Sequence, residues 1–478
     1  MKKIMTRLLS LVLLGTFIPS FVLAETWDLG KGDITVTATE TSQTVSQVNG
    51  ETKDDPDPVI TSSSGKTNNT VTITAEKNAT ANVTLENVNI DTGTTGGAAI
   101  TTSGEGNVNI ELNGTNTVQS GNTHAGVEKK DNGTLTITDE NKDGSLTATG
   151  GNYGAGIGGG YEGSGSNIAI EGGKVKAIGG THGAGIGGGF GGSGSNIAIE
   201  GGKVEASSVG GGAGIGGGSL GSGSNIAVSG GEVTAQGGVG GAGIGGGQGG
   251  SGSKITIEGG EVTAQGDAGG AGIGGGISGT GSDVTISGDA QVKVQGGTTG
   301  RDWHKGAAIG NGGTPTTDGN EVSPNTSDLK VGGFIQIYEP GKNINTDTPD
   351  RTIEGQKGDH SWNAGEVTTA ETVPESKAAA YWVSDSEGQS IPYQAQQKDG
   401  VLTVTVQADT ASLHGTTGSL GQLEAQGVAE IRFVTNGAQS AFTLSDLLTS
   451  GTGSFTLTHD GDKVTFTLES TDISGILK

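Results

Sequence analysis

The most regular feature of the chain is a pattern of apolar residues and glycines that returns every 29 residues. The string Gly-Ala-Gly-Ile-Gly-Gly-Gly occurs five times between Gly154 and Gly276, and the spacing never drifts. A fixed period of this length is typical of stacked repeat proteins, in which each unit buries its apolar face against its neighbours. Glycine-rich disorder is the alternative, since 97 of the 478 residues are glycine. Disorder, however, requires no apolar residue at a constant phase.

Each unit holds three short apolar segments separated by glycine-rich corners. In the first copy they are 155–157, 168–170 and 175–177. The second segment alternates apolar and polar residues, as a half-buried strand does. Helices are disfavoured, because each interior glycine costs about 1 kcal/mol relative to alanine. The sequence therefore predicts an all-β fold, a parallel β-helix with three strands per 29-residue coil and coils about 4.8 Å apart.

Stacked coils place equivalent residues above one another, so the pattern also predicts internal ladders. The first ladder would contain Ile170, Ile199, Val228, Ile257 and Ile286. Val175, Val204, Val233 and Val262 would form a second, with Ala177, Ala206, Ala235 and Ala264 beside it. At one corner phase, Asn167, Asn196 and Asn225 predict a column of amides that are hydrogen-bonded from coil to coil.

Weaker copies of the repeat set the predicted domain boundaries. They extend the β-helix to residues 70–312, about eight coils and a rod on the order of 40 Å long. Residues 25–69 are expected to cap the open first coil, because stacked strands need protected edges. Residues 313–369 are interpreted as a linker with short strands. Residues 370–478 are interpreted as a small, mostly-β domain with hairpin turns at Asn436-Gly437 and Asp460-Gly461.

The first 24 residues have the pattern of a secretory signal peptide. Lys2, Lys3 and Arg7 form a basic start, an apolar run begins at Leu8, and Ala24 ends a small-residue cleavage site. We expect cleavage after Ala24, export to the cell surface or the extracellular space, and no membrane insertion of the mature chain. The sequence contains no cysteine, so it holds neither disulfides nor a thiolate metal site.

The charge of the chain narrows the class of partner. The formal net charge is −25, whereas nucleic-acid-binding proteins present basic stripes. We therefore expect no nucleic-acid partner. Divalent cations and neutral glycans remain compatible with this charge.

The repeat resembles the extracellular β-helical carbohydrate-binding family of bacterial surface proteins. The strings that carry the resemblance are 133–137 (Gly-Thr-Leu-Thr-Ile), 146–151 (Leu-Thr-Ala-Thr-Gly-Gly) and 154–157 (Gly-Ala-Gly-Ile). The resemblance covers about half of the chain, residues 70–312, and implies a right-handed β-helix, with glycan and calcium binding in some members. No binding residue carries over from the family, because the matching positions are structural glycines and core aliphatic residues.

Candidate ligand-binding residues are the aromatic side chains of the corner loops. Tyr153 and His182 share one phase of the repeat, and Tyr161 and Phe190 share another. Aromatic residues on adjacent coils would form a platform on which sugar rings stack. The alternative, that these are incidental loop aromatics, stays open, since later copies have glycine, serine, glutamine or isoleucine at these phases.

A metal site is only weakly indicated. Residues 191–199 superficially match the nonapeptide of calcium-binding β-rolls. The aspartate phase of that motif is mostly asparagine here, and the nonapeptides are not in tandem. We expect no cofactor and no assigned metal ligands, and leave calcium binding open.

These features favour a secreted or surface-associated, non-catalytic protein that binds polysaccharide. A structural rod or adhesin that displays the C-terminal domain is the main alternative. A polysaccharide lyase or hydrolase is less favoured, because residues 151–300 contain no arginine and their carboxylates are isolated. We assign no catalytic residue and leave the oligomeric state open.

Overall fold

The computed structural model describes residues 24–355 and 381–478, with short gaps. The gaps are 49, 51, 131, 301–303, 327, 387–390, 392, 399, 418–422, 424–427, 452–453, 462 and 470. The predicted signal peptide, apart from Ala24, residues 356–369 of the predicted linker and residues 370–380 of the predicted C-terminal domain lie outside the described residues. None of the described helices is long and apolar enough to cross a membrane.

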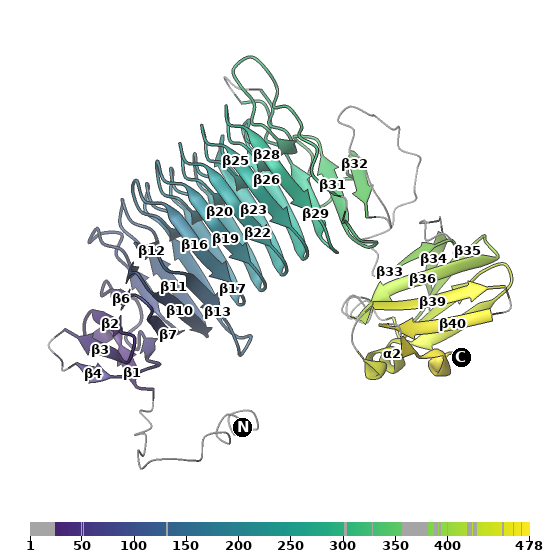
Figure 1. Cartoon of the computed structure of the whole chain (residues 1–478), viewed down its shortest axis with the longest axis horizontal. Coiled ribbons are helices and arrows are strands. Elements are labelled where there is room, and N and C mark those ends of the chain that lie inside the picture. Colours follow the sequence, from purple (N-terminus) through teal and green to yellow (C-terminus); the bar gives the residue numbers. More distant parts are fainter. Residues whose placement is uncertain are drawn as a thin grey trace, which may run out of the picture.

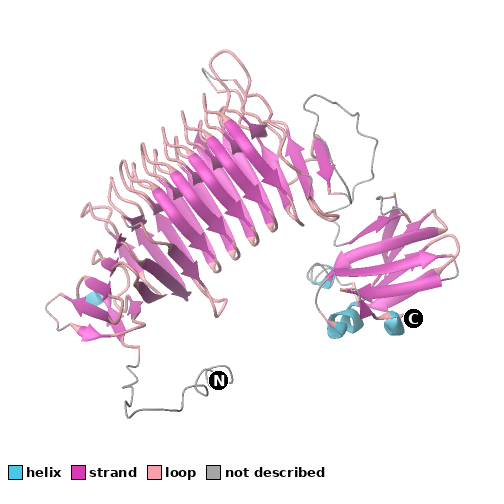
Figure 2. Cartoon of the chain, in the orientation of Figure 1, coloured by secondary structure: helices cyan, strands magenta, loops and turns pink. Residues whose placement is uncertain are grey.

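Three long β-sheets wrap around one continuous hydrophobic core, and each coil from β6 (Val71–Ala75) to β29 (Gln291–Gln295) contributes one strand to each sheet (Figures 1 and 2). The first sheet contains β1 (Thr26–Asp28), β5 (Val59–Thr61), β7 (Thr80–Glu86), β10 (Asn107–Asn113), β13 (Leu135–Thr138), β16 (Gly165–Ile170), β19 (Gly194–Ile199), β22 (Gly223–Val228), β25 (Gly252–Ile257) and β28 (Gly281–Ile286). The second contains β8 (Asn89–Asp91), β11 (Thr115–Gln119), β14 (Ser145–Thr149), β17 (Lys174–Gly179), β20 (Lys203–Ser208), β23 (Glu232–Val239), β26 (Glu261–Asp267), β29 (Gln291–Gln295), β31 (Phe334–Tyr338) and β32 (Arg351–Glu354). The third contains β4 (Lys53–Asp54), β3 (Gln43–Gln47), β2 (Ile34–Ala38), β6 (Val71–Ala75), β9 (Ile100–Gly104), β12 (Val127–Lys129), β15 (Ile157–Gly158), β18 (Ile186–Gly187), β21 (Ile215–Gly216), β24 (Ile244–Gly245), β27 (Ile273–Gly274) and β30 (Ile309–Gly310).

The predicted ladders are present, which confirms the parallel β-solenoid with 29-residue coils. Ile170 pairs with Ile199, which pairs in turn with Val228, and all three side chains are buried. The valine ladder continues in the same way, with Val175 opposite Val204. The apolar phases of the repeat are therefore the core of the protein.

Glycine is required where the third strand of each coil turns. Gly158 has φ +133°, a conformation that side chains with a Cβ rarely adopt. A Cβ there would also lie 2.1 Å from the carbonyl oxygen of Gly187 on the next coil. The recurrent glycines thus permit the close approach of neighbouring coils.

The predicted asparagine column is also present. Asn196 Nδ2 donates to Asn167 Oδ1 over 2.8 Å, and Asn225 Nδ2 donates to Asn196 Oδ1 over 2.6 Å. All three residues have φ values between 52° and 57°, in the left-handed region that asparagine tolerates better than most residues. Each amide therefore satisfies its neighbour while holding a tight corner.

The stack extends beyond the predicted boundaries of 70–312 at both ends. Before residue 70, β2 pairs with β6 in parallel, and β3 and β4 close this edge in antiparallel fashion. After residue 312, β31 of the predicted linker pairs in parallel with β29, and β32 closes that edge. Of the ten strands in the first sheet, the eight from β7 to β28 lie within 70–312, as expected, and β1 and β5 extend the sheet before residue 70. The end strands lack the repeat signature, which is why sequence spacing did not reveal them.

A carboxylate helps to close the C-terminal end of the third sheet. Glu321 lies at this end, and its two oxygens accept the backbone N–H groups of Ala308 and Ile309 over 2.7 and 3.2 Å. These are the donors that a further coil would otherwise pair with. Burial raises the pKa of the Glu321 carboxyl group.

The C-terminal domain consists of two sheets around a separate core, as expected for a small, mostly-β unit. One sheet contains β33 (Tyr381–Ser384), β36 (Thr410–Thr416), β39 (Ser454–Asp460), β40 (Lys463–Leu468) and β41 (Thr471–Asp472), and the other contains β34 (Tyr393–Lys398), β35 (Val401–Val406), β37 (Glu430–Val434) and β38 (Gln439–Thr443). The helix α2 (Leu444–Ser450) follows β38 directly. Both predicted hairpins form, β37–β38 at Asn436-Gly437 and β39–β40 at Asp460-Gly461.

Candidate functional site

The four candidate aromatic residues lie together on the corner loops of two adjacent coils. Tyr153 and His182 stack with ring centroids 5.2 Å apart and an interplanar angle of 13°. Tyr161 and Phe190 stack at 5.8 Å and 14°. The two stacks meet edge to face, with Tyr153 and Tyr161 at 5.5 Å and 89°. The backbone fixes this arrangement, because Phe190 N donates to the Tyr153 carbonyl oxygen over 2.9 Å.

Tyr161 is the member of this ring cluster that is most accessible to a ligand. Its exposed fraction is 47%, whereas the other three rings are partly buried. Phe190 stacks on one face of the Tyr161 ring, and the exposed part of the Tyr161 side chain lines a pocket. A hydrogen bond to Glu162 and the charge of that carboxylate raise the pKa of the Tyr161 hydroxyl. The phenol therefore stays neutral at physiological pH.

The rings are confined to these two coils. In the following coils the Tyr161 phase holds Ser219, Gln248 and Ile277. Ile277 is buried and lies against Gly240, where an added Cβ would come within 2.6 Å of its Cδ1. The platform is thus a local feature of one end of the repeat array.

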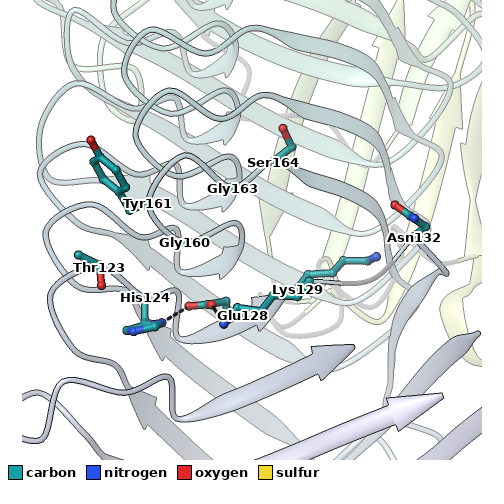
Figure 3. A pocket seen from close by; sticks show the side chains of 10 residues that line it. Thr123, His124, Glu128, Lys129, Asn132, Gly160, Tyr161, Gly163 and Ser164 are labelled. Carbon is teal, nitrogen blue, oxygen red and sulfur yellow. Dashed lines mark hydrogen bonds and ion pairs between the residues drawn. The ribbon is translucent and has the colours of Figure 1, made fainter. Parts of the chain in front are cut away.

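A pocket of about 570 Å³ lies beside Tyr161 (Figure 3). Its lining residues are Thr123, His124, Glu128, Lys129, Lys130, Asn132, Gly160, Tyr161, Gly163 and Ser164. Tyr161 and Ser164 come from the loop between β15 and β16, and the charged residues come from the coil before it. Of the lining residues, only Tyr161 was singled out from the sequence.

The pocket results from a change of residue type at one phase of the repeat. Residues 127–130 are Val-Glu-Lys-Lys, whereas the next coil has Ile-Gly-Gly-Gly at 157–160. The strands pair in register, with Val127 opposite Ile157 and Glu128 opposite Gly158. Long charged side chains therefore adjoin a coil that has none at these positions, and we call this feature the charged step (residues 128–130). The Glu-Lys-Lys string in a glycine phase is the sequence signal that could have located it.

Glu128 is the centre of the charged step. Its side chain is only 3% exposed, yet it contacts two basic residues. Oε2 lies 2.6 Å from His124 Nδ1 and accepts the Ala125 N–H over 3.1 Å. Oε1 lies 2.6 Å from Lys130 Nζ. Lys129, also buried, donates to the Gly133 carbonyl oxygen over 2.6 Å. Both Glu128 oxygens are thus engaged by the protein.

The arrangement combines an aromatic face with polar groups of several kinds. Thr123, Ser164 and Asn132 are exposed at the pocket and offer hydroxyl and amide groups. Sites for small polar ligands commonly have this composition, an apolar wall with a few placed polar atoms. Among the described residues there is no group of three or more His, Cys, Asp or Glu side chains placed to hold a metal ion.

Comparison with known proteins identifies the repeats. Five segments match the family described as a beta helix repeat, at residues 142–161, 168–190, 197–219, 226–248 and 255–277. No curated protein and no solved structure matches the chain at a significant level. The matched segments coincide with the regular coils, and the coordinates show those coils stacked in parallel sheets. On both grounds the chain is a β-helix repeat protein.

Proposed function

We propose that this chain is a secreted or surface-associated, non-catalytic protein that binds polysaccharide through the corner loops of its solenoid. The observation that carries the proposal is the ring cluster, whose exposed member, Tyr161, borders the pocket at the charged step. The pattern of residues 1–24 and the resemblance of the repeat to carbohydrate-binding surface proteins support the same assignment.

The chemistry of sugars favours this kind of surface. A sugar ring has an apolar face of C–H groups and a rim of hydroxyls. The apolar face packs on an aromatic ring, which buries area at a low cost in side-chain entropy. The hydroxyl rim needs directed donors and acceptors, such as those of Thr123, Asn132 and Ser164. The Phe190 stack also fixes the position of Tyr161, so little ordering is needed on binding.

Retention on immobilised polysaccharides tests this function directly. The chain from Glu25 to Lys478 is incubated with insoluble and soluble glycans, both with calcium and with a chelator. Retention on at least one glycan is the expected result. Retention on none would favour a structural rod or adhesin, and release of shorter sugars during incubation would favour a lyase or hydrolase.

A further inference from the structure

We propose that the pocket at the charged step selects a sugar that carries an anionic group, a carboxylate or a sulfate. The anionic group would contact Lys130 and His124 while the sugar ring lies against Tyr161. This inference rests on the proposed polysaccharide-binding function and specifies the class of sugar.

The charge that a ligand can reach in this pocket is positive. The Lys130 side chain is 54% exposed and that of His124 is 27% exposed, whereas that of Glu128 is only 3% exposed. Both carboxylate oxygens of Glu128 also already contact donors of the protein itself. An incoming ligand therefore meets an ammonium and an imidazole, and its anionic group is not opposed by an accessible carboxylate at the step.

The buried carboxylate also fixes the geometry of these donors. It holds His124 through Nδ1, so Nε2 is the remaining polar ring atom of this pocket-lining residue. Glu128 Oε1 lies 2.6 Å from Lys130 Nζ and restricts the lysine side chain before the ligand arrives, so less side-chain entropy is lost on binding. Donors that are placed before the ligand arrives give stronger charge-assisted hydrogen bonds at a lower entropic cost.

The aromatic side of the pocket is compatible with an anionic ligand. Glu162 is the acidic residue next to Tyr161 in the sequence, and its carboxylate is engaged by the Tyr161 hydroxyl. The exposed part of the Tyr161 ring is apolar and would pack on the C–H face of the sugar, so the ring and the charged step would contact different parts of one sugar unit. The positive groups stand out in a chain whose formal net charge is −25.

Matched pairs of ligands test the proposal. The chain from Glu25 to Lys478 is titrated with a uronic-acid oligosaccharide and its carboxyl-reduced form, and with a sulfated glucan and its unsulfated parent. At least one anionic member should bind about tenfold more tightly than its neutral partner. This advantage should shrink as ionic strength rises from about 0.01 M to about 1 M. The pair that shows it identifies the anion as carboxylate or sulfate.

Lysine variants locate the effect. Lys130→Gln should lose the preference for the anionic ligand, and Lys130→Arg should keep most of it. Lys176→Gln is the matched control, since Lys176 is equally exposed at 54% and lies 3.7 Å from a carboxylate, that of Glu205, away from the pocket. Circular dichroism confirms that each variant remains folded.

The outcomes separate this inference from the proposed function. Equal binding of charged and neutral ligands, or an equal loss in Lys130→Gln and Lys176→Gln, would overturn the anionic site while polysaccharide binding stands. If the chain binds none of the four ligands and no other glycan, both the anionic site and the polysaccharide-binding function are overturned.

Discussion

The Glu128 carboxylate lies against Gly160 of the next coil, where a Cβ would come within 3.0 Å of Oε2. The same Cβ would lie 2.8 Å from the carbonyl oxygen of Thr123. The absence of a side chain at Gly160 therefore leaves room for the Glu128 carboxylate at the pocket, in addition to its place in the repeat.

Replacing this glycine should disturb the charged step. Gly160→Ala must displace a backbone carbonyl or a held carboxylate, and overpacking of this kind costs about 1–3 kcal/mol. Gly97→Ala is the control, because a Cβ at residue 97 meets nothing within 4 Å. We expect chemical denaturation to show destabilisation by Gly160→Ala and little change or a slight gain for Gly97→Ala. Equal behaviour of the two variants would contradict the described packing.

Strand β19 should tolerate a charged residue on its outward-facing side but not on the side that faces the core. Ile199→Asp places an unpaired carboxylate in the core, which we expect to cost more than about 4 kcal/mol and to unfold several coils. Ala198→Asp, one residue earlier on a partly exposed phase, should be nearly neutral. Limited proteolysis and thermal melting distinguish the two. A stable Ile199→Asp solenoid would refute the assignment of this phase to the core.

The asparagine column should depend on backbone conformation as well as on its amides. Asn196 has φ +53° and hydrogen-bonds with both Asn167 and Asn225. Asn196→Gly loses the amide but also removes the Cβ from the left-handed region, whereas Asn196→Ala loses the amide and keeps a Cβ there, at about 1–2 kcal/mol relative to glycine. Denaturation midpoints should therefore rank wild type first, glycine second and alanine last. A more stable alanine variant would show that the corner is not strained.

The C-terminal domain should lose stability in mild acid. His414 contacts the hydroxyls of Ser384 at 2.8 Å and Thr456 at 3.0 Å, and burial lowers its pKa from 6.5 to about 4. Between these two values the unfolded chain binds more protons than the folded domain, so stability falls as the pH drops from about 6.5 to about 4. Below about pH 4, His414 causes no further loss of stability. The loss is on the order of 3 kcal/mol.

Denaturation of the full chain at about pH 7 and about pH 5, with proteolysis to identify the domain that opens, measures this loss. His414→Gln cannot titrate and should reduce the pH dependence. Some pH dependence of stability should remain in this variant, because burial lowers the pKa of His459 as well. An unchanged pH dependence in His414→Gln would exclude His414 as the cause.

If the protein is exported and its signal peptide is cleaved after Ala24, the mature chain has a defined N-terminus. Mass spectrometry of the extracellular or periplasmic fraction should find a chain that begins at Glu25. The structure accommodates this start, since Glu25 N donates to Asp55 Oδ2 over 3.0 Å. A full-length product confined to the cytoplasm would contradict cleavage and secretion.

The regular coils were predictable because their repeats are nearly identical. Once Ile157 and Ile186 occupy the same phase, stacking at strand spacing follows, and so does the burial of each apolar ladder. The asparagine column followed from the same logic. Contacts within one phase can therefore be predicted from a drift-free period.

The ends of the stack and the pocket could not be predicted in this way. β1 and β31 pair with neighbouring coils but lack the repeat string, so no phase pointed to them. The ring cluster joins two phases, and the period does not state how far apart those phases lie in space. The charged step depends on a contrast between Glu128 and Gly160, that is, on a departure from the repeat rather than on the repeat itself.

Titration of a retained polysaccharide against ring variants tests the central claim most directly. Tyr161→Ala combined with Phe190→Ala should weaken binding by about tenfold or more, because stacking on aromatic residues contributes most of the apolar contact. Val239→Ser is the control, since Val239 is 54% exposed and outside the ring cluster and the pocket. We predict unchanged affinity for Val239→Ser and a large loss for the double ring variant. Wild-type affinity in the double variant would contradict the account and move the binding surface elsewhere on the protein.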